Sequence, residues 1–105
     1  MQNPKSTGKV PISIGEVVLV LRGRDKGRLM LVIAAENEGV VYVADGDRRR
    51  IARPKRKNLR HLASEGWIDE ELATLLMSGK PPSDLDIRKR LQIRMDQEGG
   101  EEHGR

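Results

Sequence analysis

The sequence predicts a mainly β domain, a small closed barrel, followed by a C-terminal pair of helices. Two nearly continuous apolar runs rich in Val, Leu and Ile, at residues 17–21 and 29–35, flank a polar loop that contains glycine. A third such run follows at 40–44, and the apolar spacing becomes helical beyond residue 62. Short strands of this kind favour a closed barrel, because closure removes the exposed edges of a lone meander.

The first strands form a hairpin in this interpretation. Residues 1–11 are polar, contain Pro and Gly and show no periodicity, so we expect a flexible lead-in. The runs 17–21 and 29–35 then pair across the loop 22–28. Because both runs are apolar at almost every position, we expect strands that are covered on more than one face. The barrel as a whole is assigned to residues 12–62.

The remaining strands are predicted from turn chemistry. A strand at 40–44 is followed by Asp45-Gly46, a strong hairpin signal because glycine tolerates the positive φ of a tight turn. We therefore expect the chain to return as a fourth strand at 48–52. Pro54 lacks an N–H for a sheet ladder and interrupts this strand, after which residues 58–62 are expected to form a short closing strand.

Residues 63–98 are predicted to form a helical hairpin. Apolar residues recur at helical spacing from Ile68 to Leu76, and Gly79 with two prolines ends this helix. Ser83 begins an approximate capping box for a second helix. Trp67 is expected to anchor the helices on the barrel, since a large apolar ring suits that junction. Residues 99–105 are predicted to be a disordered tail.

The charge of the chain is unevenly distributed. The 105 residues include 20 Lys and Arg and 16 Asp and Glu, yet residues 1–62 carry a net charge of +8 and residues 63–105 carry −4. The chain has no cysteine, which excludes disulfides, thiolate metal sites and cysteine nucleophiles and fits a reducing cytoplasm. No apolar segment approaches the roughly 20 residues that a membrane span needs. We therefore expect a soluble, cytoplasmic protein with no membrane partner.

The most basic part of the chain is residues 48–61, which hold eight Lys or Arg in fourteen positions and no acidic residue. A solvated edge strand needs only one or two lysines to discourage aggregation. Eight unrelieved cations point instead to a polyanionic partner, because each cation placed on a phosphate releases condensed counterions. Nucleic acid is therefore the expected ligand.

Residues 15–28 (GEVVLVLRGRDKGR) resemble the KOW motif, a strand, glycine loop and strand unit shared by ribosomal proteins and transcription elongation factors. Residues 44–46 (ADG), 48–50 (RRR) and 57–62 (KNLRHL) narrow the match. Together they look like small KOW-domain proteins related to the archaeal and eukaryotic large-subunit ribosomal protein L-fourteen-e. The resemblance implies an SH3-like barrel that binds RNA, with ribosomal RNA or the ribosome as the expected partner.

Candidate RNA-binding residues follow from the resemblance and the charge pattern. The resemblance implies contacts from Arg24, Lys26, Arg28, Arg48, Arg49, Arg50, Lys55, Lys57, Arg60 and His61. The charge pattern adds Arg22 of the glycine loop and Arg53 and Arg56 of the basic segment 48–61. Because Tyr42 and Trp67 are the only aromatic residues, base stacking on exposed rings is not expected. The sequence predicts recognition of the phosphates and shape of structured RNA.

Catalysis and metal binding are not expected. No nucleophile elbow and no phosphate-binding loop occurs in the sequence, and His61 and His103 lack the partners of a metal site. We therefore expect a non-enzyme without cofactor or metal. Two other functions stay open: a DNA-associated or transcription-elongation accessory factor, and a protein interaction module. The C-terminal helices either cover the barrel or present a surface to RNA or to a protein partner.

Overall fold

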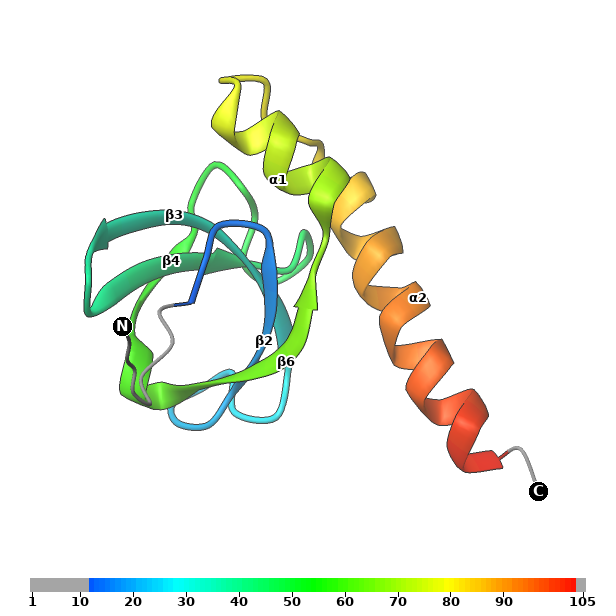
Figure 1. Cartoon of the computed structure of the whole chain (residues 1–105). Coiled ribbons are helices and arrows are strands. Elements are labelled where there is room, and N and C mark those ends of the chain that lie inside the picture. The colour runs from blue at the N-terminus through cyan, green and yellow to red at the C-terminus, as the bar shows by residue number, and fades with distance from the viewer. Residues whose placement is uncertain (1–11, 104–105) are drawn as a thin grey trace, which may run out of the picture.

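The computed structural model describes residues 12–103 as a five-stranded sheet followed by two helices (Figure 1). The predicted lead-in at 1–11 and residues 104–105 lie outside this range. The strands and helices are β2 (Glu16–Val20), β3 (Leu29–Asn37), β4 (Val40–Ala44), β5 (Lys55–Asn58), the 3-10 helix η1 (Leu59–His61), β6 (Leu62–Ile68), α1 (Glu70–Met77) and α2 (Asp84–His103).

All strand pairs are antiparallel, and the order in the sheet is β5-β4-β3-β2-β6. Strands β2 to β5 follow one another as a meander, and β6 returns to pair with β2. The sheet curls strongly (Figure 1), but its pairing leaves β5 and β6 as edges. The mainly β class and the two C-terminal helices are confirmed, whereas the closed SH3-like barrel is not.

The apolar runs form strands because both faces of the sheet are covered. Alternate residues of β2 point to opposite faces: Val18 belongs to a cluster with Met30 and Val43, and Val17 to a second cluster with Leu31. The helices cover this second face, to which they contribute Leu72, Ile87 and Leu91. Continuously apolar strands are the expected result of burial on two faces.

Trp67 anchors the helices, as predicted. Its ring packs against the cluster shared by the sheet and the helices, and the guanidinium of Arg94 in α2 lies 5.0 Å from the ring centroid. The side chain of Asp69 caps α1 by accepting a hydrogen bond from Leu72 N, and Arg90 of α2 pairs with that carboxylate at 2.6 Å. Among the described helices, none has the length and apolar character that crossing a bilayer would require.

The predicted fourth strand at 48–52 is wrong. Residues 45–54 form an irregular loop, and β5 begins only after Pro54. The side chain of Asp45 accepts hydrogen bonds from the backbone of Asp47 and Arg49, and the N–H groups of Asp45 and Gly46 both donate to the Arg49 carbonyl. These bonds fold the loop back on itself, so it cannot extend as a strand.

The predicted bounds near the two ends of the helical region also differ from the structure. The closing strand expected at 58–62 is wrong: these residues are the end of β5, the 3-10 helix η1 and the first residue of β6. The strand that closes the chain's path is β6, which runs from Leu62 to Ile68 and pairs with β2. Residue 68 therefore belongs to a strand, and α1 begins at Glu70. At the other end, α2 runs to His103, through residues that we expected to be a disordered tail.

Candidate nucleic-acid interface

The loop between β2 and β3 is pinned to β5 by a buried lysine. Lys57 is only 8% exposed, and its Nζ donates to the backbone carbonyl of Arg22 at 2.8 Å. Gly23 makes room for this contact, because a Cβ at its position would lie 2.8 Å from Nζ, and its φ of +94° disfavours other residues. Lys57 therefore supports the glycine loop from within.

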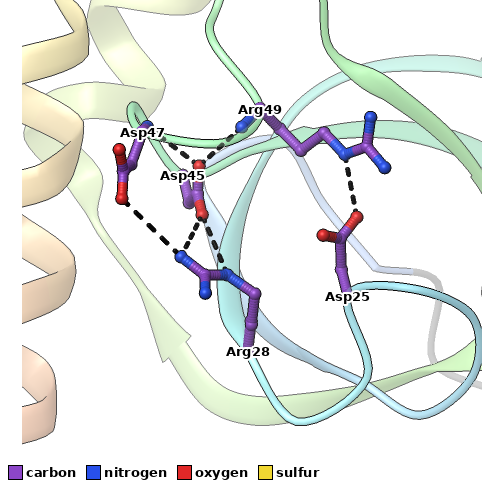
Figure 2. Close-up of polar contacts among 5 residues, drawn as sticks. All are labelled: Asp25, Arg28, Asp45, Asp47 and Arg49. Atoms are coloured by element: carbon purple, nitrogen blue, oxygen red, sulfur yellow. Dashed lines mark hydrogen bonds and ion pairs between the residues drawn. The ribbon is translucent and has the colours of Figure 1, made fainter.

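Two ion pairs join the same loop to the loop that follows β4 (Figure 2). Arg49 Nε donates to Asp25 Oδ2 at 2.8 Å, and Arg28 Nη2 lies 3.1 Å from Asp45 Oδ2. Asp47 is a more distant partner of Arg28, at 3.9 Å. The residues in these pairs are 17 and 24 positions apart in sequence, so the fold brings the two basic segments side by side.

Asp45 organises the second loop and stays ionised. Its burial on its own would raise the pKa of the carboxyl group. The backbone N–H groups of Arg49 and Asp47 and the guanidinium of Arg28 outweigh this effect and hold the pKa below its ordinary value. Gly46 packs so closely against α2 that a Cβ there would lie 2.2 Å from the carbonyl oxygen of Asp84. The loop is thus fixed to both the sheet and the helix.

Most of the predicted cations remain exposed on these segments. Within residues 12–97 they have no acidic partner at ion-pair distance: Arg22, Arg24, Lys26, Arg48, Arg50, Arg53, Lys55 and Arg60. Three of the other arginines do form ion pairs, and their partners are Asp25, Glu36, Asp45 and Asp47 of the same half of the chain. In the C-terminal half, Asp69 and Glu71 pair with Arg90.

The pKa of His61 reflects the positive charges around it. It is half-buried at the end of η1, and its backbone carbonyl accepts a hydrogen bond from Leu21 N at 2.8 Å. Burial first, and then the charges of Arg60, Arg22 and Lys57, lower the pKa of His61 below 6.5. A histidine whose charged form is opposed by three cations lies in an electropositive region.

Arg56 lies apart from this group. In the register of β4 and β5, Lys57 lies opposite Val41 of the core, whereas Arg56 lies opposite Tyr42 on the other face. Arg56 donates two hydrogen bonds to Glu36, and the Tyr42 hydroxyl donates a third. These bonds lower the pKa of Glu36 to about 2, the bond from Arg56 having the largest effect. Arg56 is thus engaged in a separate cluster.

A groove of about 410 Å³ lies between the two loops and α2. It combines charged and polar side chains with a short apolar strip. Its lining residues are Gly27, Arg28, Leu29, Asp45, Asp47, Arg88, Leu91, Gln92 and Met95. Its charged lining is two arginines and two aspartates, so the groove carries no excess of positive charge.

The charge pattern of the sequence did not predict which residues fix the two basic loops in place. Asp25 and Asp45 were treated as loop and turn residues, yet they fix Arg49 and Arg28 in place. Lys57 was expected to contact RNA but is largely buried. The isolated carboxylate of Asp25 within a basic loop was the one available signal, because an acid among cations implies a specific partner.

Among the described residues, no group of three or more His, Cys, Asp or Glu side chains is arranged so that it could hold a metal ion. Comparisons of the sequence with models of known protein families and with curated proteins found no match. The resemblance to KOW-domain proteins therefore stays a prediction from the residues quoted above. Any function has to be argued from the site itself.

Proposed function

We propose that this protein is a non-catalytic RNA-binding protein of the KOW type, with an SH3-like barrel, and that it binds structured RNA, with ribosomal RNA as the target. The observation that carries the proposal is a set of eight exposed cations on the two loops, β5 and η1. None of them has an acidic partner within residues 12–97. They are Arg22, Arg24, Lys26, Arg48, Arg50, Arg53, Lys55 and Arg60. The ion pairs of Asp25 and Asp45 and the bond from Lys57 connect the two loops and β5 to one another.

Electrostatic capture of phosphates is the mechanism. Each exposed cation that meets a phosphate releases condensed counterions, and loops that are already connected to one another lose less entropy on binding. The scarcity of aromatic residues favours structured RNA, bound through its phosphates, over extended single strands whose bases need rings to stack on. Tyr42 bonds to Glu36, and Trp67 is partly buried against the apolar cluster with Arg94 over its ring, so neither supplies an open stacking platform. The cytoplasm is the compartment that we propose for it.

The SH3-like barrel is part of the proposal. The sheet order and the short η1 between the edge strands β5 and β6 support closure, because a three-residue link keeps the two edges near each other. A protein interaction module is less well supported, since peptide grooves of such barrels are lined by aromatic residues. If a protein partner exists, we propose that it binds the C-terminal helices.

The test is a titration of a fluorescent structured RNA and a DNA duplex of equal length over a range of salt concentrations. If about six phosphates are engaged, the logarithm of affinity falls against the logarithm of salt with a slope of roughly −5. Contacts to 2′-hydroxyl groups make the RNA affinity higher. Absence of binding, or equal affinity for DNA, would overturn the proposal and, in the second case, favour the DNA-associated alternative.

A matched pair of variants locates the surface. Arg24→Ala with Lys26→Ala removes two exposed cations from the glycine loop, whereas Lys80→Ala with Lys89→Ala removes two exposed cations from the helical region. Both double variants change the net charge equally. The loop variant is expected to reduce the salt slope by about 2 and the helical variant to leave it nearly unchanged. Equal effects would show that only the total charge matters.

A further inference from the structure

Arg49 differs from its neighbours Arg48 and Arg50 because it is held at both ends. Its backbone N–H donates to Asp45 Oδ1 at 2.9 Å, and its carbonyl accepts from the N–H groups of Asp45 and Gly46 at 2.9 and 3.1 Å. Its side chain is held by the bond from Nε to Asp25 Oδ2 at 2.8 Å. The exposed side chains of Arg48 and Arg50 have no such partner within the described residues.

The contact with Asp25 leaves the outer edge of the Arg49 guanidinium unused. Only Nε donates a hydrogen bond to Asp25, and within the described residues neither Nη atom of Arg49 forms a hydrogen bond (Figure 2). The side chain is 29% exposed, so part of it is within reach of a ligand. The planar pair of Nη atoms presents parallel N–H groups, which match two acceptors lying side by side.

Asp25 is costly for a protein that binds a polyanion. Its carboxylate is 1% exposed, and Oδ1 is buried without a hydrogen-bond partner in the described part of the chain. A buried acceptor without a partner destabilises the fold, and a negative charge in a basic loop opposes the approach of phosphate. The placement of Asp25 is explained if the carboxylate orients a cation that needs a defined direction.

We propose that Arg49, positioned by Asp25, makes a directional two-point contact with the RNA, while the exposed cations supply non-directional attraction. The ligand chemistry is a pair of adjacent acceptors, either two phosphate oxygens or the O6 and N7 atoms of a guanine. This inference rests on the proposed RNA-binding function. Asp25 is a positioning residue, and Arg49 is the residue that touches the RNA.

Removal of the Asp25 carboxylate distinguishes positioning of Arg49 from simple electrostatic attraction, because the two predict opposite changes in RNA affinity. The probe is a fluorescein-labelled RNA hairpin with an internal loop rich in guanine. Asp25→Ala makes the protein more positive, so electrostatics alone predicts tighter binding, whereas loss of positioning predicts binding at least about fivefold weaker. Asp47→Ala removes the same charge from an exposed site that does not hold Arg49, and it is expected to tighten binding.

Two further comparisons complete the test. Asp25→Asn keeps an acceptor oxygen for Nε and is expected to recover most of the affinity that Asp25→Ala loses. Arg49→Lys keeps the charge but removes the planar fork, and we expect about tenfold weaker binding, against less than about twofold for Arg48→Lys. If thermal melting shows that Asp25→Ala does not fold, the two lysine variants decide the question.

The results distinguish the two proposals. Tighter binding by Asp25→Ala, as for Asp47→Ala, would overturn the inference, and so would equal losses for Arg49→Lys and Arg48→Lys. In both cases binding by the unchanged protein would leave the proposed function intact. Substitution of 7-deazaguanine in the probe then identifies the acceptors: the penalty of Arg49→Lys disappears if Arg49 contacts guanine N7, and it persists if Arg49 contacts phosphate.

Discussion

Replacement of Lys57 by methionine tests whether the buried ammonium group stabilises the glycine loop. Methionine keeps the approximate length of the side chain and removes the donor that lies 2.8 Å from the Arg22 carbonyl. A hydrogen bond from a charged group contributes about 1.5–3 kcal/mol, and part of this is recovered because the charge is no longer desolvated. We expect the free energy of unfolding to fall by about 1–2 kcal/mol.

The assay is thermal unfolding followed by circular dichroism, with urea unfolding as a second measurement. For a domain of this size each kcal/mol shifts Tm by about 4–8 °C, so Tm is expected to fall by roughly 5–15 °C. Amide exchange adds a local readout. The N–H of Gly27 donates to Val20 O at 2.8 Å within the loop, and its exchange is expected to accelerate when the loop loses its internal support.

Lys55→Met is the matched control. Lys55 lies two residues earlier on the same face of β5, opposite Val43, and is exposed with no ion pair in the described residues. Its replacement is expected to change stability by less than about 0.5 kcal/mol. If the Tm of Lys57→Met equals or exceeds that of the control, the reasoning is refuted. The desolvation free energy of the buried ammonium group would then be at least as large as the stabilisation from its hydrogen bond.

Three further outcomes follow from the geometry. Arg56→Gln should raise the pKa of Glu36 from about 2 towards its ordinary value, and a carboxyl-carbon NMR titration that leaves the pKa unchanged would contradict the assigned cause. The pKa of His61 is lower in the folded chain than in the unfolded chain, so the unfolded chain binds more protons as the pH falls below about 6.5. The free energy of unfolding therefore decreases in this range. His61→Gln should remove this dependence, so that the urea midpoint of the variant changes less than that of the original protein between about pH 7.5 and about pH 5. Gly46→Ala should lower the free energy of unfolding by at least about 2 kcal/mol, because the new Cβ meets a backbone carbonyl of α2. Gly66→Ala is the control: its φ is also positive but the space around it is open, so it should cost only about 1 kcal/mol. Equal melting temperatures of the two variants would exclude the clash.

The predictable parts of the fold were those encoded by neighbouring residues. Apolar runs gave the strands at 16–20, 29–37 and 40–44 to within a few residues, and Gly79 with the following prolines gave the end of α1. Charge counting located the basic segments correctly. These signals act over a few positions of the chain, so periodicity and turn residues suffice to recognise them.

Long-range contacts account for what the sequence concealed. The loop at 45–54 replaced an expected strand because Asp45 captured the backbone around it. Lys57 and Arg56 are adjacent and equally basic, yet one is buried beneath the glycine loop and the other is paired on the opposite face. Contacts such as that of Lys57 with Arg22 join residues 35 positions apart. Which cation stays open to a ligand depends on such pairings, and these form only when the sheet brings distant segments together.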